Sequence, residues 1–408
     1  MIKHALMNLI SAGLLRANPF LITIYTANNF SKSEFGEFSF FQSTSAVIAF
    51  VCLAGVSSTI IKKTSELKDE IFLNEIFKPT LIGLSFFYSL IISVLVLFVL
   101  LLLEYVGLIN GENLIPLVLI AFFSINSGFN SGFILGAKNY FILCKASFLV
   151  SIFTFFSISF NDYFSLGLNP TYILVSYYIG YSVILFYLND SYKFLCSVAR
   201  MDIKIVKDIF SFGLPIFLSG LLYLPVIWVM ISHLNIEYGL EMVAEFNPSY
   251  QLYIIMTFIS STISQVMLQK FSGKEINGLT KPLAIMFSIM MVVSIVIYYF
   301  GLDLLMLFGK EYVSTKQVFN YFIITGVISS LCFVSGNFIV SKFSGWYSFI
   351  LNLIWSFSAL LIYFNCLKSL AASAIPVSLL FAYLILFIST IIIVAMKNEK
   401  KCAFNMFR

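Results

Sequence analysis

Long apolar blocks recur along the whole chain and constrain its fold more than any other feature. A helix needs roughly 20 apolar residues to cross a hydrocarbon core of about 30 Å, and the breaks between these blocks are short. Hydrophobic residues make up 60% of the sequence and charged residues only 11%, far outside the range of soluble domains. The sequence therefore predicts an all-α polytopic membrane protein without a soluble domain.

The apolar blocks predict about twelve transmembrane helices. Their ranges are residues 6–27, 37–61, 79–103, 114–136, 140–160, 171–189, 210–233, 243–269, 282–300, 313–340, 346–366 and 370–396. Lys and Arg residues beside a span resist translocation, so their distribution predicts the orientation. If the N-terminus is cytoplasmic, the only basic residues in the outside loops are Lys32, Lys310, Lys316 and Lys368. We therefore predict an even number of spans, with both termini in the cytoplasm.

Similar short sequence segments recur at a nearly constant separation along the chain and indicate two related halves. "GLLRANPFLITI" from Gly13 resembles "GLLYLPVIWVMI" from Gly220, and "SGFILGAK" from Ser131 resembles "SGNFIVSK" from Ser335. In the same order, "GEF" at 36–38 matches "AEF" at 244–246, and "KP" at 78–79 matches "KP" at 281–282. Six helices per half is an even number, so both halves enter and leave on one face and the repeat is parallel. The repeat predicts two parallel six-helix bundles around a central cavity.

The repeat divides the chain into four predicted segments. They are an N-terminal bundle at 1–190, a cytoplasmic link at 191–209, a C-terminal bundle at 210–396 and a basic cytoplasmic tail at 397–408. In the link, Arg200, Lys204 and Lys207 recur at helical spacing. This pattern fits a short interfacial helix on an anionic leaflet, and it equally fits positive-inside charge with no further role.

Arg16 lies in the middle of the first predicted span, where an Arg costs about 2.5 to 3.5 kcal/mol on insertion scales. On a helical wheel it falls within a polar or small sector of roughly 80°; the other members are Asn8, Ala12, Pro19, Thr23 and Thr26. This stripe favours a helix that lines an aqueous cavity, with Arg16 and Thr23 contacting an anionic substrate. The alternative is a structural Arg paired with a buried carboxylate or with helix carbonyls. Pro19 favours a kink, which suits a moving gate or a packing role.

The fourth predicted span, "FSINSGFNSGFILGAK", carries small and polar residues on different sides. Gly128, Gly132 and Gly136 recur at every fourth position and predict a seam for close helix contact. Asn126 and Asn130 lie elsewhere on the wheel. Their amides suit contact with a polar ligand or with another helix.

Other polar residues near the spans are less specific. Glu37 and Glu245 occupy equivalent repeat positions at helix ends, and Lys145 and His233 lie near span ends; Glu37, Lys145 and Glu245 are weaker candidates for substrate contact. No Asp or Glu lies clearly in mid-membrane, which leaves coupling to a proton or sodium gradient open. The six cysteines show no metal-like pattern, so no metal or cofactor is expected.

The chain has no GxxxxGK[ST] loop, no HExxH and no GxSxG motif. Direct ATP hydrolysis in this chain is therefore unexpected. A transporter is favoured over an enzyme.

The motifs resemble those of the multidrug/oligosaccharidyl-lipid/polysaccharide exporter superfamily and, within it, bacterial Wzx-type O-antigen flippases. The opening 43 or so residues are similar in their long first helix, short loop, "FG" pair at Phe35 and Gly36, and aromatic second helix. "GLP" at 213–215 resembles the opening of the family's seventh helix, and "FGKEY" at 308–312 resembles the segment before its tenth. Many relatives carry a basic residue before the "FG" loop, whereas this chain has residues 27–29, "ANN", there. A role of that basic residue in the relatives therefore cannot be assigned to this chain.

The resemblance implies a flippase in the bacterial inner membrane. It would move undecaprenyl-diphosphate-linked O-antigen repeat units to the periplasmic leaflet by alternating access. Arg16 would meet the diphosphate or an acidic sugar, and Asn126 and Asn130 would meet hydroxyls. Expected partners are the lipid-linked oligosaccharide, membrane lipid and polysaccharide assembly proteins, with no nucleic acid.

Two other functions compete with this one. An ion-coupled drug exporter of the same superfamily would predict a carboxylate-rich cavity, whereas the clear mid-span charge here is basic. A membrane-embedded polysaccharide polymerase generally needs a sizeable extramembrane loop, whereas the outside loops are short.

Overall fold

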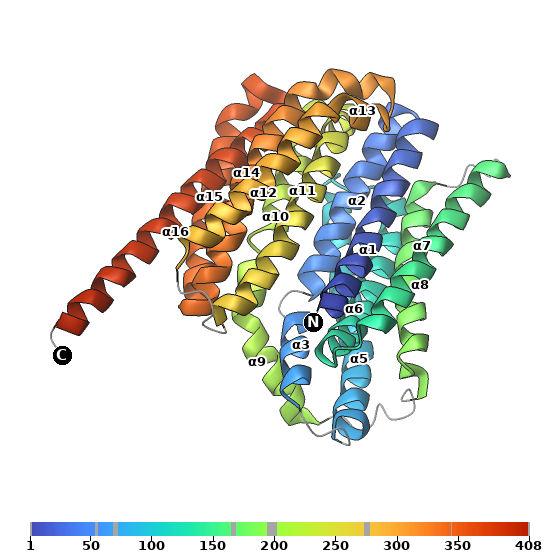
Figure 1. Ribbon diagram of the computed structural model, residues 1–408. Helices are drawn as coiled ribbons and strands as arrows, with labels where there is room; N and C mark the ends of the chain where they lie inside the picture. Colours follow the sequence, from blue (N-terminus) through green and yellow to red (C-terminus); the bar gives the residue numbers. More distant parts are fainter. Residues whose placement is uncertain are drawn as a thin grey trace. The chain divides into compact units, whose positions relative to one another are not determined.

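The computed structural model describes residues 2–53, 56–67, 72–164, 169–193, 202–272, 278–343 and 345–406. These ranges are almost entirely helical and contain no strand (Figure 1). Eleven of the described helices are long and apolar enough to cross a membrane. The helix at the predicted eighth span, α11 (Leu240–Ser272), is not among the eleven, although it is 33 residues long. The predicted all-α polytopic fold is confirmed.

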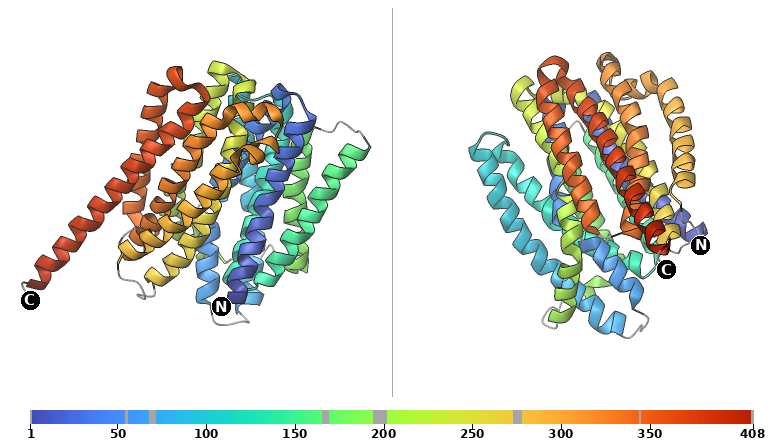
Figure 2. Two further views of the ribbon diagram at one scale, coloured as in Figure 1. Left: turned by 45° about the horizontal axis from the view of Figure 1, so that its top comes forward. Right: turned by 90° about the vertical axis from the view of Figure 1, so that its left-hand side faces the viewer.

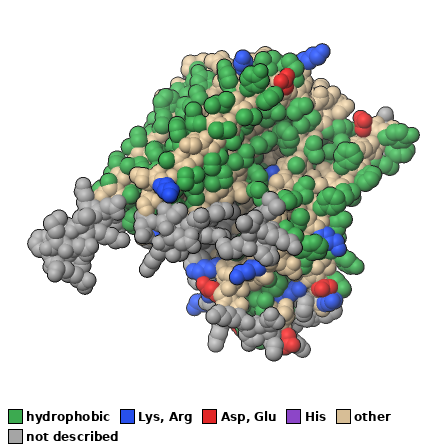
Figure 3. Space-filling model, in the orientation of Figure 1, with side chains coloured by type: hydrophobic (Ala, Val, Ile, Leu, Met, Phe, Trp, Pro, Cys, Tyr) green, Lys and Arg blue, Asp and Glu red, His purple; other side chains and the backbone are tan. Residues whose placement is uncertain are grey.

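Exposed apolar side chains cover much of the face shown in Figure 3, and the charged side chains lie mostly toward its margins. Such an apolar surface would be a liability in water, but it is the surface that lipid tails require.

The chain forms two compact units, Met1–Phe30 with Phe38–Leu224, and Ser31–Glu37 with Pro225–Arg408. The helices of the first unit are α1 (Ile2–Asn29), most of α2 (Lys32–Leu53), α3 (Val56–Glu66), the π-helical turn Leu73–Phe77, α5 (Lys78–Tyr105), the short turn Gly111–Asn113, α6 (Leu114–Gly136), α7 (Tyr140–Tyr163), α8 (Pro170–Leu188) and α9 (Ile203–Gly220). Those of the second unit are α10 (Leu224–Tyr238), α11, α12 (Thr280–Tyr299), α13 (Gly301–Met306), the turn Lys310–Thr315, α14 (Lys316–Lys342), α15 (Gly345–Leu370), the turn Ala371–Ser373 and α16 (Ala374–Met406).

Each unit is organised around one central helix. In the first unit α6 packs against α3, α5 and α8, and in the second α14 packs against α11, α12 and α16 (Figures 1 and 2). These two helices contain or lead into the similar sequence segments of the repeat, at 131–138 and 335–342. In the second unit, α16 extends as one long helix to Met406 and so includes most of the predicted tail at 397–408, whose side chains are not among those described.

Helix starts follow local sequence signals. The Asn169 side chain accepts a hydrogen bond from the Thr171 backbone N–H at 3.0 Å, and Pro170 occupies the first position of α8. At the start of α2, the Ser31 N–H donates to Glu34 Oε2 at 2.9 Å, and the Glu34 N–H donates to Ser31 Oγ at 3.3 Å. This reciprocal capping box fixes the position where α2 begins.

The first turn of α2 packs within the second unit. Phe35 is fully buried and meets the Tyr312 ring edge-on, with ring centroids 5.5 Å apart. A side chain at Gly36 would collide with the Leu240 carbonyl. Lys32 Nζ lies 2.6 Å from Glu245 Oε1. The "FG" pair is therefore a packing motif that needs an aromatic ring followed by a residue without Cβ.

The predicted link at 191–209 lies within the first unit. Residues 194–201, which include Arg200, are outside the described ranges. From Ile203 the chain is already α9, and Ile205, Val206 and Ile209 pack into the apolar core of the first unit. The apolar side of this stretch thus contacts protein, and its role on a lipid leaflet stays a prediction.

The glycine seam of α6 is confirmed. A Cβ at Gly128 would collide with the Leu53 side chain, one at Gly132 would lie 3.2 Å from the Ser57 carbonyl oxygen, and one at Gly136 would lie 2.8 Å from the Ile61 carbonyl oxygen. The glycines allow the end of α2, at Leu53, and α3 to approach α6 closely.

Replacing Gly136 with Ala should therefore lower the stability of the protein by about 1–3 kcal/mol, because backbone has to move to admit one methyl group. The measurement is thermal unfolding of the purified protein in detergent. Gly13→Ala is the matched control, since a Cβ there meets nothing within 4 Å. Equal melting temperatures for the two variants would contradict the seam.

Candidate functional site

Arg16 is exposed on α1, beside two tyrosines of α8. It is close enough to Tyr177 and Tyr178 to interact with them electrostatically, and Tyr178 hydrogen-bonds to Ser45 of α2. No residue that the structure describes forms an ion pair or hydrogen bond with Arg16. A structural Arg of the predicted kind would have a carboxylate or carbonyl partner, so this environment favours a guanidinium that is available to a ligand.

Pro19 leaves one backbone carbonyl of α1 without its usual helical donor. Proline has no N–H, so the carbonyl of Leu15, four residues earlier, loses its helix bond. The hydroxyl of Tyr177 donates to that carbonyl at 3.2 Å. Tyr177 thereby replaces the missing N–H, which matters in a membrane because no water is there to do so.

The carbonyl of Pro19 itself accepts two side-chain hydrogen bonds. Thr23 Oγ1 donates to it at 2.7 Å, and Gln42 Nε2 of α2 donates at 3.2 Å. Gln42 Nε2 also lies 3.0 Å from Thr23 Oγ1. Both Thr23 and Gln42 are buried. The part of the predicted polar stripe at Pro19 and Thr23 thus faces α2, whereas Arg16 stays exposed.

A second face of α1 lies toward α7. Ser11 Oγ donates to the Leu143 carbonyl at 3.2 Å, and Asn161 Nδ2 donates to the Tyr25 hydroxyl at 3.0 Å. Asn18, midway between them, is fully buried, and its amide has no hydrogen-bond partner among the described residues. This face anchors the two ends of α1 and leaves an unsatisfied amide between them.

Asn126 and Asn130 lie deeper in the first unit and contact other segments of the chain. Asn126 Oδ1 accepts from Ser85 at 3.2 Å, and its Nδ2 donates to Ser89 Oγ at 3.0 Å. Asn130 Oδ1 accepts from Ser191 at 2.7 Å and from Asn189 at 3.2 Å. Of the two roles that the sequence left open, the structure shows contact with other parts of the protein. Contact with a substrate stays a prediction.

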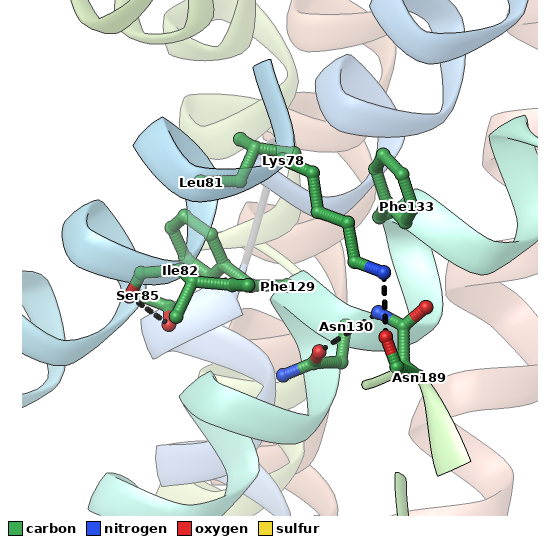
Figure 4. Close-up of a pocket in the computed structure, with 8 residues that line it drawn as sticks. All are labelled: Lys78, Leu81, Ile82, Ser85, Phe129, Asn130, Phe133 and Asn189. Carbon is green, nitrogen blue, oxygen red and sulfur yellow. Dashed lines mark hydrogen bonds between the residues drawn. The ribbon is translucent and has the colours of Figure 1, made fainter. Parts of the chain in front are cut away.

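A small cavity of about 10 Å³, space for one water molecule, lies beside Asn130 (Figure 4). Lys78 points along it from the start of α5 and donates to the Asn189 carbonyl at 2.5 Å. The same ammonium lies 5.5 Å from the centroid of the Phe133 ring. Nearby, the Lys193 ammonium hydrogen-bonds to Asp190 and holds the pKa of that carboxyl below its usual value. The cavity is too small for a sugar or a diphosphate.

The weaker candidates are scattered. Lys145 is exposed on α7, and Glu37 is half-buried on α2. Glu245 pairs with Lys32 in the second unit. The structure brings Arg16, Pro19 and Thr23 together on one helix and does not join them to Asn126 or Asn130.

Sequence reasoning missed Gln42, Tyr177 and Tyr178, the side chains that surround Arg16 and Pro19. One signal was present, because a proline inside a span frees a carbonyl and therefore requires a donor elsewhere. The sequence does not say which donor meets it.

The contact between Tyr177 and Leu15 can be tested with a double-mutant cycle. In the natural background, Tyr177→Phe should destabilise the protein by about 1 kcal/mol, because the Leu15 carbonyl loses its donor. In a Pro19→Ala background the helix regains its own N–H, so Tyr177→Phe should cost much less. Thermal unfolding of the four proteins gives the coupling. Equal costs in both backgrounds would show that the hydroxyl does not compensate for Pro19.

Comparison with known proteins gives structural matches alone. No protein-family model and no curated protein matches the sequence. The chain is similar to an inward-facing multidrug resistance MATE family transporter of the MOP superfamily, with a TM-score of 0.70 at 14% identity over 96% of this chain and 99% of that one. It is also similar to the lipid II flippase MurJ in an inward closed conformation, with a TM-score of 0.73 at 14% identity over 96% of this chain and 87% of that one.

A MOP superfamily transporter from Pyrococcus furiosus, described by a binding pocket of reverse polarity that suggests a different function, matches with a TM-score of 0.63 at 16% identity over 97% of this chain and 95% of that one. Identities this low establish a fold and no substrate. The chain therefore has the transporter fold of the MOP superfamily, the fold seen in MATE family transporters and in MurJ.

Proposed function

We propose that the chain is a flippase for lipid-linked oligosaccharides, which moves undecaprenyl-diphosphate-linked polysaccharide repeat units from the cytoplasmic to the periplasmic leaflet of a bacterial inner membrane. The observation that carries the proposal is Arg16, an exposed guanidinium within a membrane span that no described residue neutralises. A charge in that position is costly unless it serves a ligand or water.

The chemistry of a diphosphate suits this position. A guanidinium presents planar paired N–H groups that match phosphate oxygens, and the Tyr178 hydroxyl beside it adds a polar aromatic surface. In the proposed cycle Arg16 replaces part of the water around the diphosphate while the polyprenyl tail remains in lipid. Because Asn126 and Asn130 are engaged with protein, the proposal rests on Arg16 and not on them.

A drug exporter of the same superfamily is the second candidate, favoured by the match to a multidrug resistance MATE transporter. Export of cationic drugs calls for carboxylates. Glu37 and Glu245, the two acids at equivalent repeat positions, lie near the start of their helices, and Glu245 is paired with Lys32. The charge at Arg16 instead favours an anionic substrate.

The test is complementation of a bacterial strain that lacks its own repeat-unit flippase. The natural chain should restore surface polysaccharide, and Arg16→Ala should lower the restoration at least about tenfold, the effect of losing one charge-assisted contact worth about 1.4 kcal/mol. Arg16→Lys should retain part of the activity, because an ammonium attracts phosphate without the guanidinium fork.

Lys316→Ala is the control, because it removes one exposed positive charge from the second unit and should leave restoration unchanged. If Arg16→Ala reached the membrane in normal amount and restored polysaccharide fully, the role of Arg16 would be wrong. If the natural chain failed to restore polysaccharide and instead raised tolerance to cationic dyes, the drug-exporter alternative would stand.

A further inference from the structure

A histidine and a glutamate one turn apart on α10 form a pair that the transport proposal does not use. His233 Nε2 lies 4.0 Å from Glu237 Oε1, and the two side chains are 31% and 52% exposed. The chain contains only two histidines, and the other, His4, precedes the first candidate span. Histidine is the side chain whose charge ordinarily changes between about pH 5 and pH 8. His233 is thus the one imidazole within the described candidate spans.

The imidazole packs against two neighbouring aromatic rings of α15. Its centroid is 5.9 Å from that of Tyr363 and 5.0 Å from that of Phe364, with both rings nearly perpendicular to it. Nδ1 is buried and has no hydrogen-bond partner among the described residues. The distance from Nε2 to Glu237 exceeds that of a hydrogen bond. A histidine that only supports packing usually has its ring nitrogens bonded, whereas this ring is held by aromatic contacts and its Nδ1 has no hydrogen bond to a described residue.

The charged and titratable groups around His233 are few. On α10 these groups are Glu237 and Tyr238. On α15 the group is Tyr363, which is close enough to both of them to interact electrostatically. From α16 the group that reaches this part of α10 is the uncharged Ser378, 3.8 Å from Met230 Sδ. The side chains at 367–368 are not among those described. Glu237 is therefore the described carboxylate that faces the imidazole.

The position of α10 in the chain makes a charge change there consequential. The first unit ends at Leu224, and the second resumes at Pro225, so α10 is one of the places where the chain passes from one unit to the other, as it also does around residues 31–37. One turn before His233, the Met230 carbonyl accepts a hydrogen bond from the Tyr363 hydroxyl at 2.8 Å. Tyr363 thus contacts α10 twice, through the Met230 carbonyl and through the His233 imidazole.

We propose that His233 and Glu237 form a proton-binding site that couples proton uptake to movement of α10. A proton from water adds to the unprotonated imidazole nitrogen, and the imidazolium then carries N–H groups on both nitrogens. Nε2–H donates to the Glu237 carboxylate, and the pair changes from a net charge of −1 to zero. Release of the proton to water reverses both changes. The inference rests on the proposed transport function and names the proton as its coupling ion, because one imidazole and one carboxylate supply too few oxygen ligands for a sodium ion.

The first test is a direct titration. In the full-length His4→Gln variant, purified in detergent with isotope-labelled histidine, His233 gives the single imidazole NMR signal. We expect that signal to change across the range of about pH 5 to pH 8 in which histidines ordinarily change charge, and to respond to Glu237→Gln, which removes the neighbouring carboxylate. A signal that stays constant over this range, or that changes in the same way in Glu237→Gln, would overturn the proposed proton-binding site.

The second test uses the complementation assay at several external pH values. His233→Gln should lose most of the restoration and all of its pH dependence, whereas the matched control His4→Gln should keep both. A His233→Gln protein with the natural pH profile, even at reduced abundance, would show a packing role only and would overturn the inference. If the natural chain restored no polysaccharide at any pH, the transport proposal would fail, and the NMR titration would still decide whether the pair binds a proton.

Discussion

In the hydrocarbon core of a bilayer, a polar group has to find a protein partner, water or a ligand, and the first unit is built around that requirement. Pro19 removes one helix bond, and side chains from two other helices compensate. Tyr177 supplies a donor to the Leu15 carbonyl, and Gln42 bonds to the Pro19 carbonyl. Two residues of α1 depart from this pattern. The buried amide of Asn18 has no hydrogen-bond partner among the described residues, and Arg16 carries a full charge without an ion-pair partner among them. The contrast between a well-compensated proline and an uncompensated charge is the reason why the transport proposal rests on α1.

The features that the sequence predicted correctly depend on period and composition. The membrane spans follow from apolar length, and the seam at Gly128, Gly132 and Gly136 follows from four-residue spacing on one helix. The partners of Pro19 could not be predicted in this way, because Tyr177 lies far along the chain and meets Leu15 only when α1 and α8 pack at one height. The same limit explains why the sequence left two roles open for the α6 asparagines.

The first turn of α2 shows a second limit of sequence reasoning. The repeat places residues 31–37 in the N-terminal half, whereas the structure packs them within the second unit. Phe35 and Gly36 are read from the sequence as a family motif, but their physical role depends on Tyr312 and the Leu240 carbonyl, both half the chain or more away. Assigning a segment to a domain thus requires knowing what its side chains contact.

The two halves share a scaffold but not its chemistry. At the offset that aligns Gly13 with Gly220, Arg16 corresponds to Tyr223, and His233 corresponds to Thr26, a buried residue whose hydroxyl donates to its own helix at Ile22. Arg16 and His233 therefore each have an uncharged counterpart in the other half. A duplicated bundle can place one function on each copy when substitutions in one copy leave the packing of the other unchanged. If both proposals hold, the first unit supplies the charge that meets the substrate and the second supplies the group that responds to protons. The two binding events would then be separate, and one could control the other through α10.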